Sequence, residues 1–122
     1  MRQLVLPDLL IPVPLHATRL RQRGYNQSLE MARPIAKELK LPIDLYSCIR
    51  KKPTTDQIGL SAKLRKSNLK GAFIVNSDFS DTHVAIVDDV MTTGSTVNEL
   101  SQQLINAGAR RVDVWVCARA IL

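Results

Sequence analysis

The feature that most constrains this chain is the stretch of residues 84–96, which reads VAIVDDVMTTGST. Its first four residues are all apolar, as in a parallel strand that is buried on both faces. Two adjacent acids, Asp88 and Asp89, end that apolar run, and small hydroxyl residues, a glycine and a helical pattern follow. A strand, a turn of small residues and a helix start in this order predict a ligand site at the carboxyl edge of a parallel sheet.

The residues after the two acids suit a phosphate group. A helix N-terminus offers N–H groups and partial positive charge, and Gly94 lets the backbone approach an anion closely. The hydroxyl donors are Thr92, Thr93, Ser95 and Thr96. Asp88 and Asp89 are acceptors, so they suit ribose hydroxyls. The alternative is that these residues merely cap the helix, but a cap needs one acid, and burying two is costly. The stretch has neither the GK[ST] of a Walker loop nor GxGxxG.

The rest of the chain alternates between strand and helix patterns. Strands are expected at 9–13, 43–46, 72–75, 84–87 and 112–118, and helices at 27–39, 61–69 and 97–107. Asn26 is the expected N-cap of the helix at 27–39, Pro34 should kink or shorten that helix, and Gly108 should cap the helix at 97–107. This alternation predicts an α/β fold with an open, mainly parallel sheet flanked by helices.

Composition favours one folded domain over residues 1–122 and a cytoplasmic location. Hydrophobic residues make up 45% and charged residues 23% of the chain. No apolar run reaches the roughly 18 residues of a membrane span, and the N-terminus lacks a signal pattern. Cys48 and Cys117 have no metal spacing and suit a reducing compartment. The formal net charge of +6 attracts anions such as phosphates, nucleic acid or acidic lipid.

Residues 84–96 closely resemble the signature by which type I phosphoribosyltransferases bind phosphoribosyl diphosphate (PRPP). Three further segments, PVPLHATRLRQRGYNQS at 12–28, QIGLSAKLRKSNLKGAF at 57–73 and CAR at 117–119, resemble the ComF family of competence proteins, which includes the GntX-type proteins. The resemblance covers about residues 10–119 and implies a type I phosphoribosyltransferase fold. It also implies that Asp88 and Asp89 hold the ribose hydroxyls, that residues 92–96 hold the 5′-phosphate, and that Mg²⁺ arrives with PRPP and contacts the two acids through water.

The resemblance further implies that residues 15–26 form a loop that helps to bind the diphosphate, and that residues 50–68 form a mobile hood over PRPP. The candidate contacts in these segments are Leu15, His16, Arg19, Arg23, Lys51, Lys52 and Arg65. Arginine binds phosphate oxygens bidentately. The alternatives are a solvated basic turn for the arginines and a structural role for His16. Tyr25 either stacks on a nucleic-acid base or makes a core contact.

ComF proteins usually carry an upstream half with a cysteine-rich zinc module. This chain starts just before PVPLH and has no matching cysteines, so we expect no zinc here, in either a fragment or a short homologue. The expected function is PRPP binding with phosphoribosyl transfer to an unknown nitrogen acceptor, linked to DNA uptake or utilisation. The alternatives are a non-catalytic module that binds PRPP or a nucleoside monophosphate, and a protein that handles single-stranded DNA. A competence-machinery protein and a second copy of the chain are further candidate partners.

Overall fold

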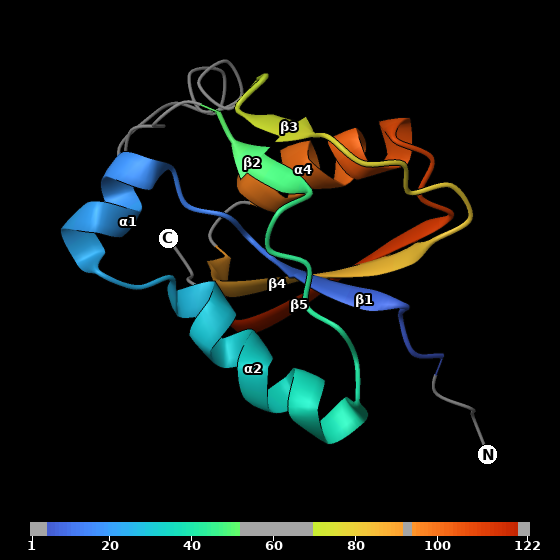
Figure 1. The fold of residues 1–122 in the computed structure, drawn as a ribbon, viewed down its shortest axis with the longest axis horizontal. Coiled ribbons are helices and arrows are strands. Elements are labelled where there is room, and N and C mark those ends of the chain that lie inside the picture. Colours follow the sequence, from blue (N-terminus) through green and yellow to red (C-terminus); the bar gives the residue numbers. More distant parts are fainter. Residues whose placement is uncertain (1–4, 52–69, 92–93, 120–122) are drawn as a thin grey trace.

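The structure is a computed structural model that describes residues 5–51, 70–91 and 94–119 (Figure 1). Its elements in chain order are β1 (Leu9–Pro12), α1 (Ala17–Arg23), α2 (Gln27–Leu39), β2 (Cys48–Arg50), β3 (Phe73–Val75), β4 (His83–Met91), α4 (Ser95–Asn106) and β5 (Arg111–Arg119). The helix expected at 61–69 lies outside the described residues. Within the described part, no helix is long and apolar enough to cross a membrane.

A parallel sheet in the order β1–β4–β5 forms the centre of the molecule. The strand β4 lies in the middle because it is apolar on both faces, and residues 83–88 are all buried. Alternate side chains of β4 point to opposite faces, so Val84 and Ile86 pack with α4, while Ala85 and Val87 pack with α2. Figure 1 shows these two helices on opposite sides of the sheet. The predicted α/β fold with a parallel sheet is confirmed.

The two short strands β2 and β3 pair antiparallel beside α4 and form a second, two-stranded sheet. The expected strand at 43–46 is wrong, because only Ile43 makes a single parallel bridge, to Leu10. The Asp44 carboxylate accepts the backbone N–H groups of Tyr46 and Ser47, each at 3.0 Å. These local bonds turn the chain, so the strand starts only at Cys48.

The helix α2 has the predicted bounds. The side chain of Asn26 caps it by accepting the N–H groups of Ser28 and Leu29. Pro34 does not shorten the helix, which continues to Leu39. Proline removes one backbone hydrogen bond, but the buried Ala32 and Ala36 hold α2 against the sheet on both sides of it.

Several other boundaries differ from those predicted. The strand β1 ends at Pro12, β3 starts at Phe73, and β5 is one residue longer at each end than the predicted 112–118. The strand β4 continues to Met91, past the two acids, because it stays paired with β5 up to Arg119. The helix α4 begins at Ser95, and its C-cap is Ala107, so Gly108 is the next residue, with a φ of 104°. Residues 15–26 are not a loop throughout, because they contain the helix α1.

Candidate functional site

Two adjacent acids lie near the carboxyl end of β4. Asp88 is only 8% exposed, and Asp89 is half-buried. The Oδ1 atom of Asp88 accepts the backbone N–H of Asp89 at 2.9 Å, and the Ser28 hydroxyl donates to the same atom at 3.5 Å. The sequence placed the two acids correctly at the end of the buried part of the strand. It did not indicate that Ser28, sixty residues earlier, would contact one of them.

Burial raises the pKa of the Asp88 carboxyl to about 7, and its side-chain hydrogen bond with Asp89 and the charge of Asp89 add to this effect. The Asp89 N–H and the Ser28 hydroxyl act in the opposite direction, since they favour the charged form. Near neutral pH the Asp88 carboxyl is therefore partly protonated and partly ionised. A carboxylate in this condition gains stability from any cation or hydroxyl donor that a ligand brings.

The N-terminus of α4 follows directly after β4. Its N-cap is Gly94, which has a φ of 84° and no side chain that could occupy the first N–H groups of the helix. Ser95 and Thr96 form the first turn and are half-buried. A twelve-residue helix that starts in this way presents partial positive charge to an anion. Thr92 and Thr93 lie outside the described residues, so their predicted phosphate contacts stay predictions.

The helix α1 lies beyond the carboxyl end of β1 and carries the predicted arginines (Figure 1). None of its residues is buried, and Arg19, Arg21 and Arg23 are all exposed. The Nδ1 atom of His16 accepts the N–H of Thr18 at 3.2 Å, so His16 is the N-cap of this helix. An acid or base role for His16 stays a prediction.

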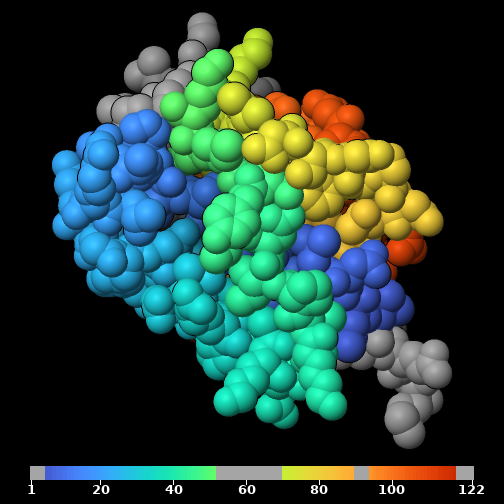
Figure 2. Space-filling model, viewed as in Figure 1, coloured from blue at the N-terminus to red at the C-terminus, as the bar shows by residue number. Residues whose placement is uncertain are grey.

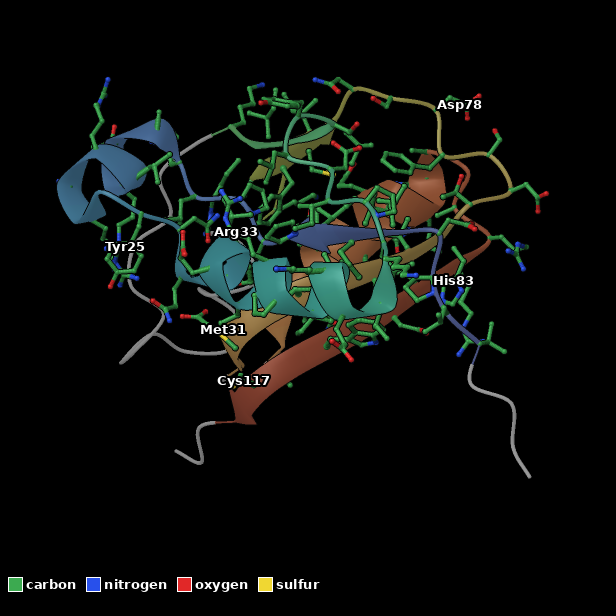
Figure 3. All side chains as sticks on the ribbon, turned by 60° about the horizontal axis from the view of Figure 1, so that its bottom comes forward. Tyr25, Met31, Arg33, Asp78, His83 and Cys117 are labelled. Carbon is green, nitrogen blue, oxygen red and sulfur yellow. The ribbon has the colours of Figure 1, made fainter. Side chains whose placement is uncertain are left out.

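Four other predicted contacts can be placed only in part. Leu15 is half-buried at the start of this segment, and Lys51 is exposed directly after β2. Lys52 and Arg65 lie outside the described residues. Tyr25 is exposed beyond α1 (Figure 3), which excludes the core contact that we weighed against base stacking.

Arg50 was expected at the start of the hood loop at 50–68, but it is the last residue of β2, and it lies near the site. Its guanidinium lies 5.3 Å from the centre of the Phe73 ring. Burial lowers the pKa of Arg50, the negative charge of Asp88 raises it, and the positive charge of Arg19 lowers it again. Arg50 is therefore within electrostatic reach of both Asp88 and α1. In Figure 2 the surfaces of α1 (blue) and β2 (green) lie side by side.

The described residues contain no group of three or more His, Cys, Asp or Glu side chains that could hold a metal ion. The two acids of β4 are a pair of oxygen donors, and Mg²⁺ takes about six oxygen ligands. A magnesium ion at this place would therefore need most of its ligands from a bound phosphate compound and water. The two cysteines are free, with Cys48 buried and Cys117 exposed.

The phosphoribosyl transferase domain family matches residues 25–120 of this chain. This chain belongs to that family. Its sequence is 44% identical to the DNA utilization protein YhgH of Salmonella typhi over 118 residues, which cover 97% of this chain and 52% of that protein. It is also 44% identical to Competence protein F of Haemophilus influenzae over 122 residues, with 97% and 53% covered. The chain thus spans about half the length of the curated relatives it matches, and the predicted resemblance to competence proteins is confirmed.

A solved structure supports the same fold. The purine phosphoribosyltransferase from Pyrococcus horikoshii superimposes with a TM-score of 0.57 and is 20% identical, over 93% of this chain and 61% of that one. At this level of identity the likeness shows the fold alone. Together with the family match, it confirms the type I phosphoribosyltransferase fold.

Proposed function

We propose that this chain binds PRPP, or a nucleoside 5′-monophosphate, and forms the phosphoribosyltransferase-like part of a protein that serves DNA uptake or utilisation. The observation that carries the proposal is the joint position of Asp88, Asp89 and the N-terminus of α4 at one edge of a parallel sheet. The link to DNA rests on the names of the relatives, a DNA utilization protein and a competence protein.

In this proposal each group recognises the part of the ligand that matches its charge. The two acids accept the ribose hydroxyls, and the start of α4 holds the 5′-phosphate. Arg19, Arg23 and Arg50 supply positive charge for the diphosphate. The transfer breaks the bond between ribose C1 and the diphosphate and forms a bond to an acceptor nitrogen. The protein contributes by positioning the reactants and by stabilising the departing negative charge.

Magnesium fits the two acids only as part of a complex with the ligand. When bound, the ion would neutralise charge on the diphosphate. Asp88 and Asp89 would hold it through ordered water, and its charge would favour the ionised form of Asp88, whose pKa is raised to about 7 without it.

Calorimetry with PRPP, in Mg²⁺ and in a chelator, tests the proposal on the folded chain. We expect binding that is at least tenfold tighter in Mg²⁺ and that is lost in Gly94→Ala, since a Cβ there would stand between the backbone and a phosphate. Gly71→Ala is the matched control, because Gly71 also has a positive φ (70°) with no atom within 4 Å of an added Cβ. Equal affinity of the wild type and Gly94→Ala would place the phosphate elsewhere.

A screen for diphosphate release then separates a transferase from a non-catalytic binder of PRPP. Purine and pyrimidine bases are offered as acceptors in turn, together with Mg²⁺ and PRPP. Release that depends on one acceptor supports the transferase. Tight binding of PRPP without release for any acceptor supports the non-catalytic module.

The exposed basic segment around α1 favours single-stranded DNA as a second candidate ligand. Arg19, Arg21 and Arg23 are exposed on it together with Tyr25, which is 49% exposed. Guanidinium groups beside an aromatic ring suit a phosphate backbone and its bases. Fluorescence anisotropy with a labelled oligonucleotide should show binding that weakens steeply between low and high salt. Binding that is absent at low salt would remove this candidate.

A further inference from the structure

The two-stranded sheet of β2 and β3 has one face towards solvent and one towards the core. Its register pairs Ile49 with Ile74, and both of these side chains are exposed. The neighbouring residues of each strand point to the opposite face, and they are Cys48, Arg50, Phe73 and Val75. The other three pack in the core, so Arg50 is an arginine on a core-facing, otherwise apolar surface. Such a position is unusual, since guanidinium groups mostly stay in water.

Arg50 rests on the ring of Phe73. The two residues are paired directly across the strands, so their side chains lie next to each other on the inner face. The guanidinium carbon is 5.3 Å from the centre of the ring, within the range of a cation–π contact. A backbone hydrogen bond of 2.6 Å from Lys51 to the carbonyl of Ala72 holds the two strands together just beyond this pair.

Phe73 is itself fixed by its surroundings. Its side chain is 2% exposed and belongs to the core cluster that packs against α4. The ring is therefore a rigid surface, and the guanidinium that lies on it is restrained in turn. The core of the domain thus reaches, through one aromatic ring, to a charged group at its edge.

The restrained guanidinium lies near the candidate site. The charges of Asp88, on β4, and Arg19, on α1, both act on Arg50. Arg19 repels Arg50, and an anion bound between them would offset that repulsion. An arginine side chain that moves freely loses much of its rotamer freedom when it binds a phosphate group. A guanidinium that is already held on a ring loses less, so it binds the anion more tightly.

We propose that Phe73 is a positioning residue, whose buried ring holds the Arg50 guanidinium in place for the diphosphate of the ligand. Phe73 then affects the binding of a diphosphate and not that of the 5′-phosphate, which belongs to the start of α4. The contact between ring and guanidinium stands on the geometry above, and its consequence for the ligand rests on the proposed function.

NMR tests the contact without any ligand. Protons above an aromatic ring resonate upfield, so Phe73→Leu should move the side-chain proton signals of Arg50 downfield, and Arg50→Lys identifies these signals. Phe79→Leu is the matched control, because Phe79 is 4% exposed in the same core cluster but lies beside Ala107, beyond the end of α4. It should destabilise the fold similarly and leave the Arg50 signals unchanged. Arg50 signals that are the same in Phe73→Leu and the wild type would overturn the inference.

Calorimetry in Mg²⁺ tests the consequence with three probes, which are PRPP, ribose 5-phosphate and inorganic diphosphate. Phe73→Leu should weaken PRPP and inorganic diphosphate about three- to tenfold and ribose 5-phosphate by less than about twofold. Phe79→Leu should change none of the three by more than about twofold. Equal weakening of PRPP and ribose 5-phosphate in Phe73→Leu would mean a general disturbance of the fold and would overturn the inference. Phe73→Met, which also lacks a ring, repeats the test if Phe73→Leu does not fold.

A double mutant shows whether Phe73 acts through Arg50. In the Arg50→Gln background, Phe73→Leu should have no further effect on PRPP, and a full additional loss would contradict the positioning role.

The probes also separate this inference from the proposed function. If Phe73→Leu weakens inorganic diphosphate but the wild type binds neither sugar phosphate, the inference stands and the proposed ligand is wrong. If the wild type binds PRPP and Phe73→Leu binds it equally well, the proposed function stands and the inference is overturned.

Discussion

A polar side chain is buried near each end of β4, but its neighbours differ between the two ends. At the amino end, His83 is 2% exposed, and its Nε2 lies 2.8 Å from Asp113 Oδ2 on β5. Its backbone N–H donates to Asp8 at 2.8 Å. At the carboxyl end, Asp88 has a second acid as its neighbour. Figure 3 shows His83 at the end of the sheet that lies far from Tyr25 and α1.

The pKa values of the acids at the two ends, Asp113 and Asp88, shift in opposite directions. Burial alone would raise the pKa of Asp113, but its hydrogen bonds to His83 and Arg111 outweigh burial and hold that pKa below its usual value. Burial and a like charge raise the pKa of Asp88 instead. A polar group that serves the fold has its partners within the chain. A pair of like charges at a sheet edge is typical of a site whose partner is a ligand.

The largest expected effect concerns the amino end. His83→Ala removes a buried ring and leaves Asp113 without one of its two partners, so the free energy of unfolding should fall by about 3 kcal/mol. Urea denaturation measures this loss. Affinity for PRPP should stay within twofold of the wild type, and a large loss of affinity in the folded variant would show that the two ends are coupled.

The next effect concerns the carboxyl end. Asp88→Asn should weaken PRPP binding in Mg²⁺ by about 30-fold, or about 2 kcal/mol, since it removes a charged acceptor. Calorimetry at pH 8 measures it. Asp113→Asn, an equal change at the other end, is the control and should bind PRPP normally. Unchanged affinity in Asp88→Asn would contradict the assignment of this acid to the ligand.

The dependence of stability on pH should differ in sign between the two ends. Because the folded pKa of Asp88 is raised from 3.8 to about 7, its ionisation destabilises the fold as pH rises through that window, and the cost is fully present above pH 7. Asp88→Asn lacks this cost, so its stability relative to the wild type should increase by about 2.5 kcal/mol between pH 5 and pH 8.

The amino end should show the reverse dependence. The pKa of Asp113 is lowered, so its contribution is present above pH 3.8 and is lost as pH falls through the folded pKa. Asp113→Asn should therefore differ most from the wild type at neutral pH and least in acid. Thermal melts at a series of pH values measure both dependences, and parallel curves for the two variants would contradict the comparison.

The smallest expected effect concerns Asn26, which caps the helix α2. Asn26→Ala removes the cap of α2 and the bond to Val13, and it should cost about 1 kcal/mol of stability. Because Ser28 follows in the same turn, PRPP binding should weaken by about twofold to fivefold. Asn26→Asp keeps the capping oxygen and should recover most of the stability but not the bond to Val13. If Asn26→Asp is no more stable than Asn26→Ala, the cap does not contribute to stability here.

Local patterns in the sequence predicted the helices and strands that are determined by residues close together in the chain. The bounds of α2 followed from helical spacing and from Asn26, since a cap acts on its own first turn. The apolar run before Asp88 predicted the buried strand, and the small residues after it predicted that a helix follows, although α4 begins at Ser95, two residues before the expected start. The two acids of the site were found in the same way, because they are adjacent in the chain.

Only the tertiary structure decided the features that depend on distant segments. Pairing with β5 extends β4 past its acids. Packing brings Ser28 against Asp88, sixty residues apart, and places Arg50 within reach of the same carboxyl. His83 had no predicted role, because its partners are on β5 and before β1. The sequence by itself thus determined the two adjacent acids of the site and the helix that follows them. The approach of segments far apart in the chain determined their burial, their partners and their charge states, since these depend on the surroundings that folding creates.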